Sequence, residues 1–270
     1  MPMAIAPDGI IIKLVDAVSD GTNTTSYSYD SLGQLVWEYN QGAGKAWEYS
    51  YDLGGNILTK TEYPYAPGTD GTWAVGEGSA VSYTYGDTAW GDLLTGWNGT
   101  TISYDGVGNP QSWQGWSLSW QGGRQLAGMS KDGETLSFSY NESGLRTEKT
   151  AGTETHSYVW DGDRLLADVG TGDTFIFHYD AGGELVGYTW TSGTAETECI
   201  LVRNLQGDVE KVLSTDGTVL ASYVYDAWGN VLSATGTLAE ENPIRYRGYY
   251  YDTETGLYYL QSRYYDPAVG

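Results

Sequence analysis

Cysteine and histidine are almost absent from this 270-residue sequence, which removes side chains on which many active sites depend. Cys199 is the single cysteine, so neither an intrachain disulfide nor a metal site built from cysteines can form. We expect Cys199 to be inert on a strand. His156 and His178 stand far apart, and each continues an alternation of polar and aromatic residues, so we expect strand positions for both and not metal ligation.

Long apolar runs are also missing. No stretch approaches the roughly 18 apolar residues of a membrane-spanning helix. The first residues, MPMAIAPDGIIIKLVDAV, lack the basic start and the long apolar run of a signal peptide. We therefore expect no membrane span, and we expect any export signal to be encoded outside this sequence.

Basic residues are scarce, with 13 Lys and Arg against 35 Asp and Glu and a formal net charge of −22. A nucleic-acid-binding surface needs clustered Lys and Arg to contact phosphates, so we expect no nucleic-acid partner. The excess of acid is typical of a soluble exposed or secreted protein. The alternative interpretation is an acidic face that attracts a basic partner.

Sequence motifs of catalysis are missing as well. We find no nucleophile elbow, P-loop, dinucleotide fingerprint or His-Glu-x-x-His pattern. Asp161-Gly162-Asp163 has the start of a calcium loop, but the rest of that loop is missing, and a turn explains the fragment more simply. We predict no catalytic residue, no metal site, no cofactor and no enzyme activity.

Tyrosine, tryptophan and glycine, by contrast, are abundant, with 24 Tyr, 11 Trp and 38 Gly against 3 Phe. Tyr and Trp carry a polar group that needs a partner, so they suit thin layers better than a deep apolar core. Glycine recurs at regular intervals, and few stretches have a helical period. These features favour short strands and tight turns.

One short pattern recurs along the chain: an aromatic residue, then Asp, then Gly about three positions later. In its first clear copy, residues 26–30 alternate polar and aromatic side chains, which predicts a strand with Tyr27 and Tyr29 on one face. Residues 31–33 predict a turn with a left-handed glycine and residues 34–39 a returning strand, so one repeat is one β-hairpin. The Asp can bond the backbone of its own turn, and the tyrosines of neighbouring hairpins are expected to stack.

The main copies of the motif with all three residues in place are these: Tyr29, Asp30 and Gly33; Tyr51, Asp52 and Gly55; Tyr104, Asp105 and Gly108; Tyr179, Asp180 and Gly183; and Tyr225, Asp226 and Gly229. Including weaker copies, the period is about 20 residues, which is typical of repeat architectures whose units bury one another's faces. Residues 63–80 and 190–198 interrupt the period and predict enlarged hairpin loops. We predict an all-β fold in which repeated β-hairpins form a coiled β-sheet ribbon.

The C-terminal stretch, residues 245–270, reads RYRGYYYDTETGLYYLQSRYYDPAVG and is the most distinctive part of the sequence. Together with the repeats it resembles the YD-repeat family, which includes bacterial Rhs proteins and animal teneurins, and the stretch itself resembles the Rhs-core-associated terminus. The resemblance covers about residues 26–270. It divides the chain into a lead-in (1–25), a YD-repeat hairpin array (26–198) and Rhs-core-associated repeats (199–270). The motif residues of the terminus are Arg245, Asp252, Gly256, Arg263, Tyr265, Asp266 and Pro267.

The resemblance implies that the ribbon is part of a hollow shell, which in a full-length bacterial protein encloses or displays that protein's own C-terminal toxin or effector. It also implies a secreted or bacterial cell-surface location. In many bacterial members a self-cleaving aspartyl protease segment follows the terminus, whereas this sequence stops at Gly270. We therefore carry over no protease site and expect Asp252, Asp266 and Arg263 to be structural. The expected function is a non-catalytic scaffold, a partial shell.

Two other functions stay open. Repeats of this length that are rich in Trp and Tyr also build carbohydrate-binding modules, in which Trp97, Trp113 and Trp116 would be exposed and stack on sugars; the partner would be a glycan or a cell-surface receptor. The second is a remnant of the autoprotease. An open ribbon would also expose edge strands, which predicts edge-to-edge self-association.

Overall fold

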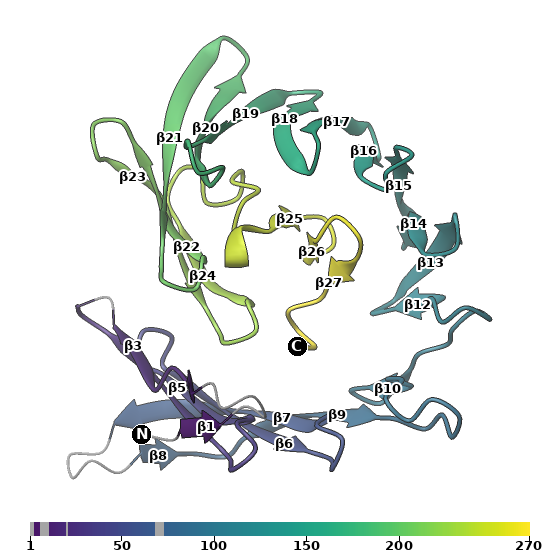
Figure 1. Cartoon of the computed structure of the whole chain (residues 1–270), viewed down its shortest axis with the longest axis vertical. Helices are drawn as coiled ribbons and strands as arrows, with labels where there is room; N and C mark the ends of the chain where they lie inside the picture. The colour runs from purple at the N-terminus through teal and green to yellow at the C-terminus, as the bar shows by residue number, and fades with distance from the viewer. Residues whose placement is uncertain (1–2, 6–10, 20, 68–72) are drawn as a thin grey trace. The chain divides into compact units, whose positions relative to one another are not determined.

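The computed structural model describes residues 3–5, 11–19, 21–67 and 73–270, and the chain divides into two compact units, Met1–Ser103 and Tyr104–Gly270. In the described residues every regular element is a β-strand except one short 3-10 helix, η1 (Tyr246–Gly248) (Figure 1). The predicted all-β class is confirmed. None of the described residues belongs to a helix long and apolar enough to cross a membrane.

The first unit contains an antiparallel sheet of nine described strands in the order β11-β10-β9-β7-β6-β5-β4-β3, with β8 paired to the end of β7. A separate pair is formed by β1 (Met3–Ile5) and β2 (Ile11–Lys13). The strands of the sheet are β3 (Ala17–Ser19), β4 (Thr24–Tyr29), β5 (Leu35–Asn40), β6 (Lys45–Tyr51), β7 (Ile57–Pro67), β8 (Trp73–Val75), β9 (Ser79–Thr84), β10 (Gly96–Trp97) and β11 (Thr100–Thr101).

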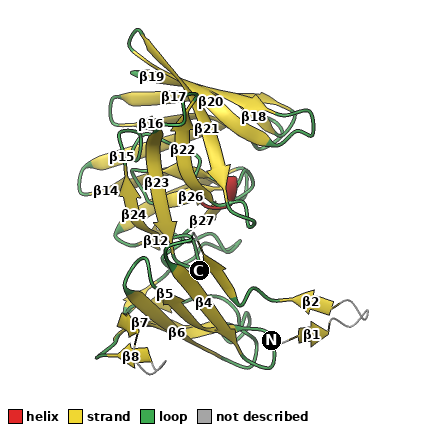
Figure 2. Ribbon diagram, turned by 90° about the vertical axis from the view of Figure 1, so that its left-hand side faces the viewer, coloured by secondary structure: helices red, strands yellow, loops and turns green. Residues whose placement is uncertain are grey.

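The second unit contains an antiparallel sheet of 13 strands, β12 to β24, in which every strand pairs with its sequence neighbours. They are β12 (Ser112–Trp113), β13 (Trp116–Gln121), β14 (Gln125–Lys131), β15 (Glu134–Tyr140), β16 (Arg146–Ala151), β17 (Glu154–Asp161), β18 (Arg164–Gly170), β19 (Asp173–Tyr179), β20 (Leu185–Ser192), β21 (Ala195–Arg203), β22 (Val209–Ser214), β23 (Val219–Tyr225) and β24 (Val231–Thr235). Figure 2 shows the later strands side by side.

The C-terminal segment, residues 237–270, lies on the concave side of this 13-stranded sheet (Figure 1). It carries η1 and a small sheet of β25 (Tyr250–Asp252), β26 (Leu257–Tyr259) and β27 (Tyr264–Tyr265). Tyr250, Leu257 and Tyr259 of this segment pack against buried sheet residues such as Phe138, Tyr158 and Phe175. The core of the second unit is thus a layer between the curved sheet and the segment inside it.

The hairpin prediction holds in detail for the first repeat, where β4 and β5 flank the turn at residues 30–33. Of the two predicted enlarged loops, the one at residues 190–198 is wrong, whereas Glu62 pairs with Ser79, so the connection between β7 and β9 is enlarged as expected. Trp190 pairs with Thr197, so residues 190–198 are a long hairpin and no loop, because alternating aromatic and β-branched residues favour strands. In the stretch 63–80, β7 continues to Pro67, β8 pairs with it, and residues 68–72 lie outside the described part.

A β-bulge recurs at the motif residue of the hairpins. The strand register shifts immediately before Tyr29, Tyr51, Tyr140, Tyr179 and Tyr225, and also before Trp120 and Trp160. A bulge bends its strand and increases the local twist. Bulges of this kind recur along the 13-stranded sheet and bend its strands at regular intervals.

Candidate functional site

The acid or amide of each motif closes its own turn. In seven turns the side-chain oxygen accepts hydrogen bonds from the backbone N–H groups two and four residues later, at 2.8–3.0 Å. The predicted glycines have φ between 79° and 90°, a region that other residues rarely adopt. The turn residues are Asp30, Asp52, Asp105, Asn141, Asp180, Asn204 and Asp226, and the predicted glycines are Gly33, Gly55, Gly108, Gly183 and Gly229.

The aromatic residue of the motif ties one repeat to the preceding one. The hydroxyl of Tyr51 donates to the carbonyl of Leu35 at 2.7 Å, and that of Tyr179 donates to the carbonyl of Leu165 at 2.9 Å. Tyr29, Tyr140 and Tyr225 make the same bond to Val15, Leu126 and Val209, and the indoles of Trp120 and Trp160 bond Pro110 and Arg146. We expected ring stacking between neighbouring motif tyrosines; the contact that recurs is this hydrogen bond. Tyr104 forms an isolated bridge with Pro110.

Arg146 and Asp252 form the centre of the contact between the sheet and the C-terminal segment. Arg146 Nη1 and Nη2 lie 2.6 Å and 3.0 Å from the two carboxylate oxygens of Asp252, and both side chains are buried. The guanidinium carbon lies within 6 Å of five aromatic rings, those of Phe138, Tyr158, Tyr250, Tyr259 and Tyr264. Cation–π attraction adds to the ion pair in this desolvated position.

Lys149 joins the same cluster by contacting Asp252 at 3.1 Å and Glu254 at 2.9 Å. Burial would raise the pKa of Asp252, but the positive charges of Arg146 and Lys149 outweigh burial and hold that pKa below its ordinary value. Asp252 is therefore ionised at neutral pH. We expected Asp252 to be structural, and the sequence did not predict its partners Arg146 and Lys149.

A second buried carboxylate, Asp168, links the sheet to the C-terminal segment. Its oxygens contact His156 Nδ1 at 2.8 Å and accept a hydrogen bond from the hydroxyl of Tyr250. Burial would lower the pKa of His156, but the hydrogen bond and the charge of Asp168 outweigh burial, so that pKa is raised. His156 and His178 lie on strands β17 and β19, as expected.

Three consecutive residues of the terminus contact both ends of the 13-stranded sheet. The Tyr265 hydroxyl donates to the carbonyl of Trp228, and the carbonyl of Pro267 accepts from Asn230, both in the turn before β24. Asp266 Oδ2 accepts from the Trp113 indole at 2.6 Å, at β12, and from Gln114 at 2.8 Å. The segment therefore joins the first and the last hairpin of the sheet.

The remaining residues of the predicted terminus have separate positions. Arg245 is buried, donates to the carbonyls of Ala239, Glu240 and Asn242, and lies over the ring of Tyr251. Gly256 has a positive φ of 74° in the turn before β26. Arg263 is exposed in the turn before β27, and its side chain has no ion pair within the described residues. Asp252, Tyr265 and Asp266 thus contact the sheet, whereas Arg263 takes no part in these contacts.

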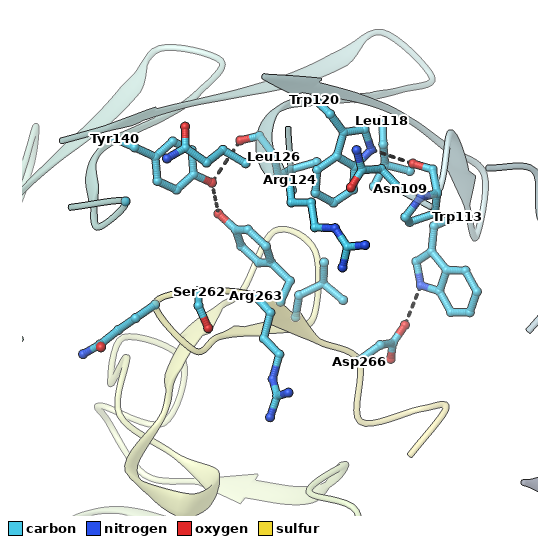
Figure 3. Close-up of a pocket in the computed structure, with 16 residues that line it drawn as sticks. Asn109, Trp113, Leu118, Trp120, Arg124, Leu126, Tyr140, Ser262, Arg263 and Asp266 are labelled. Atoms are coloured by element: carbon cyan, nitrogen blue, oxygen red, sulfur yellow. Dashed lines mark hydrogen bonds between the residues drawn. The ribbon is translucent and has the colours of Figure 1, made fainter. Parts of the chain in front are cut away.

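A cavity of about 460 Å³ lies between strands β12–β15 and the hairpin of β26 and β27. Figure 3 shows Trp120, Leu118 and Leu126 on the sheet side, with Arg124 directed toward its middle. The hydroxyls of Tyr140 and Tyr264 meet at 3.1 Å on its wall. Most of the exposed surface of the lining is apolar, as in many small-molecule sites.

Among the described residues, no group of three or more His, Cys, Asp or Glu side chains could hold a metal ion. Burial raises the pKa of Cys199 to about 11, so its thiol stays protonated, and the thiolate is the reactive form. This agrees with the inert role expected for Cys199.

Comparison with known proteins places these features in context. No family model matches the sequence. The chain is 34% identical over 250 residues to the tRNA3(Ser)-specific nuclease WapA of Bacillus spizizenii, which covers 90% of this chain and 10% of the relative. It is 24% identical over 300 residues to the double-stranded DNA deaminase toxin A of Burkholderia cenocepacia, which covers 95% of this chain and 19% of the relative.

This chain is similar to one segment of much larger proteins. Its fold is that of a crystal structure of TcdB2-TccC3-TEV, with a TM-score of 0.68 and 19% sequence identity, over 99% of this chain and 15% of the other. The shared fold confirms the predicted ribbon of β-hairpins, which in this chain forms open antiparallel sheets. The chain spans about a tenth of the length of the WapA relative.

The relatives correct one prediction. We expected a protein without enzyme activity, whereas the related proteins are named as tRNA nucleases and as a DNA deaminase toxin. The prediction was wrong because it was drawn from 270 residues that match only a small part of those relatives. The absence of a catalytic motif in one segment does not describe the protein to which such a segment belongs. The division at residues 25 and 198 and the motif role of the predicted residues stay predictions.

Proposed function

We propose that this chain is a wall segment of a YD-repeat shell of the Rhs type, in a toxin whose enzyme domain the shell encloses or displays. The observation that carries the proposal is the closure of the 13-stranded sheet by the C-terminal segment through Tyr265, Asp266 and Pro267. A curved wall whose first and last hairpins are held together separates an inside from an outside. The likeness to nucleases and a deaminase toxin supports an enzyme as the enclosed partner.

The proposal also covers the role of the motif residues and the location of the full-length protein. Motif turns and inter-repeat hydrogen bonds are repeated along the array, so each hairpin is fixed to its neighbour by local contacts. A shell that carries a toxin acts outside the producing cell, so we place the full-length protein at the cell surface or in the secreted fraction.

The test uses the full-length protein of which this chain is the wall. Limited proteolysis should digest its enzyme domain slowly in the intact protein and at least tenfold faster after Asp252→Asn, which loosens the segment inside the wall. Glu196→Gln, which changes an exposed side chain near the start of β21, is the matched control and should leave the rate unchanged. Equal digestion of the enzyme domain in the intact protein and in isolation would contradict enclosure.

The carbohydrate-binding alternative is not favoured by the tryptophans named for it. Trp116 is buried, and the indole of Trp113 donates to Asp266. Trp97 is half-buried on β10. A glycan array probed with this chain tests the alternative directly, and we expect no binding that depends on these three residues.

A further inference from the structure

We propose that the cavity beside Arg124 binds an organic anion that has an apolar body, with the anionic group on the guanidinium and the body against Trp120, Leu118 and Leu126. This proposal is independent of the shell function. It rests on the position of Arg124, on the lining of the cavity and on the charge of its surroundings.

The exposed side chain of Arg124 has no acidic partner among the described residues, although the protein is very acidic. The chain has 35 acidic side chains against 13 basic ones, yet no carboxylate of the described residues lies within 4.0 Å of this guanidinium. Its one hydrogen bond is from Nη2 to the carbonyl of Val107 at 3.1 Å. Since a guanidinium has five N–H donors, most of its donors are available to a ligand.

The nearest acidic residue of the cavity lining is already engaged. Asp266 Oδ2 accepts from Trp113 and Gln114, and Oδ1 accepts from the backbone N–H of Ala268. These donors hold the carboxylate in place, so it does not neutralise Arg124. The positive group therefore meets the cavity without an internal counter-ion.

The turn that carries Arg124 is held before any ligand binds. Gly122 and Gly123 have φ of 54° and 90°, and Asn109 Nδ2 donates to the carbonyl of Gly123 at 2.7 Å. Figure 3 shows the guanidinium extending from this turn toward the middle of the cavity. Because the turn is already fixed, less conformational entropy is lost when a ligand binds.

Part of the wall suits an apolar body because two of its aromatic side chains already have their polar groups bonded. The indole N–H of Trp120 donates to the carbonyl of Pro110 at 2.7 Å, and the hydroxyl of Tyr140 donates to the carbonyl of Leu126 at 2.9 Å. The ring faces remain for contact, together with Leu118 and Leu257. A volume of about 460 Å³ is in the range of small-molecule sites.

Calorimetry with 4-phenylbutyrate and with its uncharged analogue 4-phenylbutan-1-ol separates charge from apolar contact. We expect the acid to bind at least about tenfold more tightly than the alcohol, since hydrogen bonds to a charged group are the stronger kind. Arg124→Gln should reduce binding of the acid to the level of the alcohol. Arg164→Gln, an arginine outside this cavity, is the matched control and should change neither affinity.

The carboxylate that binds Arg124 could belong to a free acid or to a Glu side chain of a polypeptide. The affinity for N-acetyl-Phe-Glu-Leu-amide, compared with that for 4-phenylbutyrate, separates the two. Tighter binding of the peptide than of 4-phenylbutyrate identifies a polypeptide as the source, and tighter binding of the acid identifies a small molecule. Circular dichroism confirms that Arg124→Gln is folded. The proposal is overturned if neither anion binds at millimolar concentration, if acid and alcohol bind equally, or if folded Arg124→Gln binds the anions as the original chain does.

Discussion

Arg146 and Asp252 lie 106 residues apart in the sequence, and their side chains form a two-fold hydrogen-bonded ion pair inside the protein. Removing two charges from water is costly, so such a pair adds less to stability than its short distances suggest. We infer that its main effect is on specificity, because both groups are satisfied only when the C-terminal segment lies against strand β16.

The first prediction concerns this pair. Asp252→Asn leaves Arg146 and Lys149 buried without their counter-ion and should lower the free energy of unfolding by about 3–5 kcal/mol. The Arg146→Met and Asp252→Leu double variant removes both charges and should be less destabilised than either single variant. Urea unfolding measures all three. A loss below about 1 kcal/mol for Asp252→Asn would show that the pair is hydrated in solution.

The second prediction concerns the hydrogen bonds between repeats. Tyr179→Phe removes the bond to the carbonyl of Leu165 and should cost about 0.5–1.5 kcal/mol. Tyr249→Phe is the control, because its hydroxyl has no hydrogen bond within the described residues. Chemical denaturation compares the two. If both variants lose the same stability, the hydroxyl of the motif tyrosine does not tie the repeats together.

The third prediction separates backbone strain from steric overlap. Gly229 and Gly217 have φ of 90° and 87°, so alanine at either position is strained by about 1 kcal/mol. A Cβ at Gly217 meets open space, whereas a Cβ at Gly229 overlaps the ring of Tyr246 in the C-terminal segment. Gly229→Ala should therefore be clearly more destabilising than Gly217→Ala in thermal unfolding. Equal melting temperatures would mean that the segment does not rest on this turn.

The fourth prediction is a pH dependence from His156. Its pKa is raised in the folded protein, so its contribution to stability is fully present below the unfolded pKa of about 6.5 and is lost as the pH rises through the folded value. Asp168 and Asp173 favour the charged ring, and Lys149 opposes it. The stability difference between the original chain and His156→Gln should thus be larger at acidic than at alkaline pH.

Urea unfolding of both proteins between pH 5.5 and 8.5 tests this. His178→Gln is the control, since His178 is more exposed and lies beside Glu198 at 3.6 Å. If the difference in the free energy of unfolding between the original chain and His156→Gln is constant across this pH range, the charge of His156 does not stabilise the contact between the sheet and the C-terminal segment.

The sequence predicts the hairpins because their causes are local. Tyr29, Asp30 and Gly33 each act within one turn or on the adjacent repeat, and alternation places the side chains. The Arg146 cluster depends on curvature summed over many strands, which no single repeat contains. A signal was present in hindsight: Arg146 and Lys149 place two of 13 basic residues on one strand, β16. The carboxylate that pairs with them depends on the position of the C-terminal segment in the folded protein.

The bulge before each motif residue has a consequence for how such walls change in evolution. Each repeat adds its own increment of bending and meets only its neighbours, so duplication of a hairpin lengthens the wall without disturbing contacts inside any other hairpin. The length of the curved sheet is therefore adjusted in whole repeats. The terminal segment that joins the first and the last hairpin must then adapt to each new distance between them.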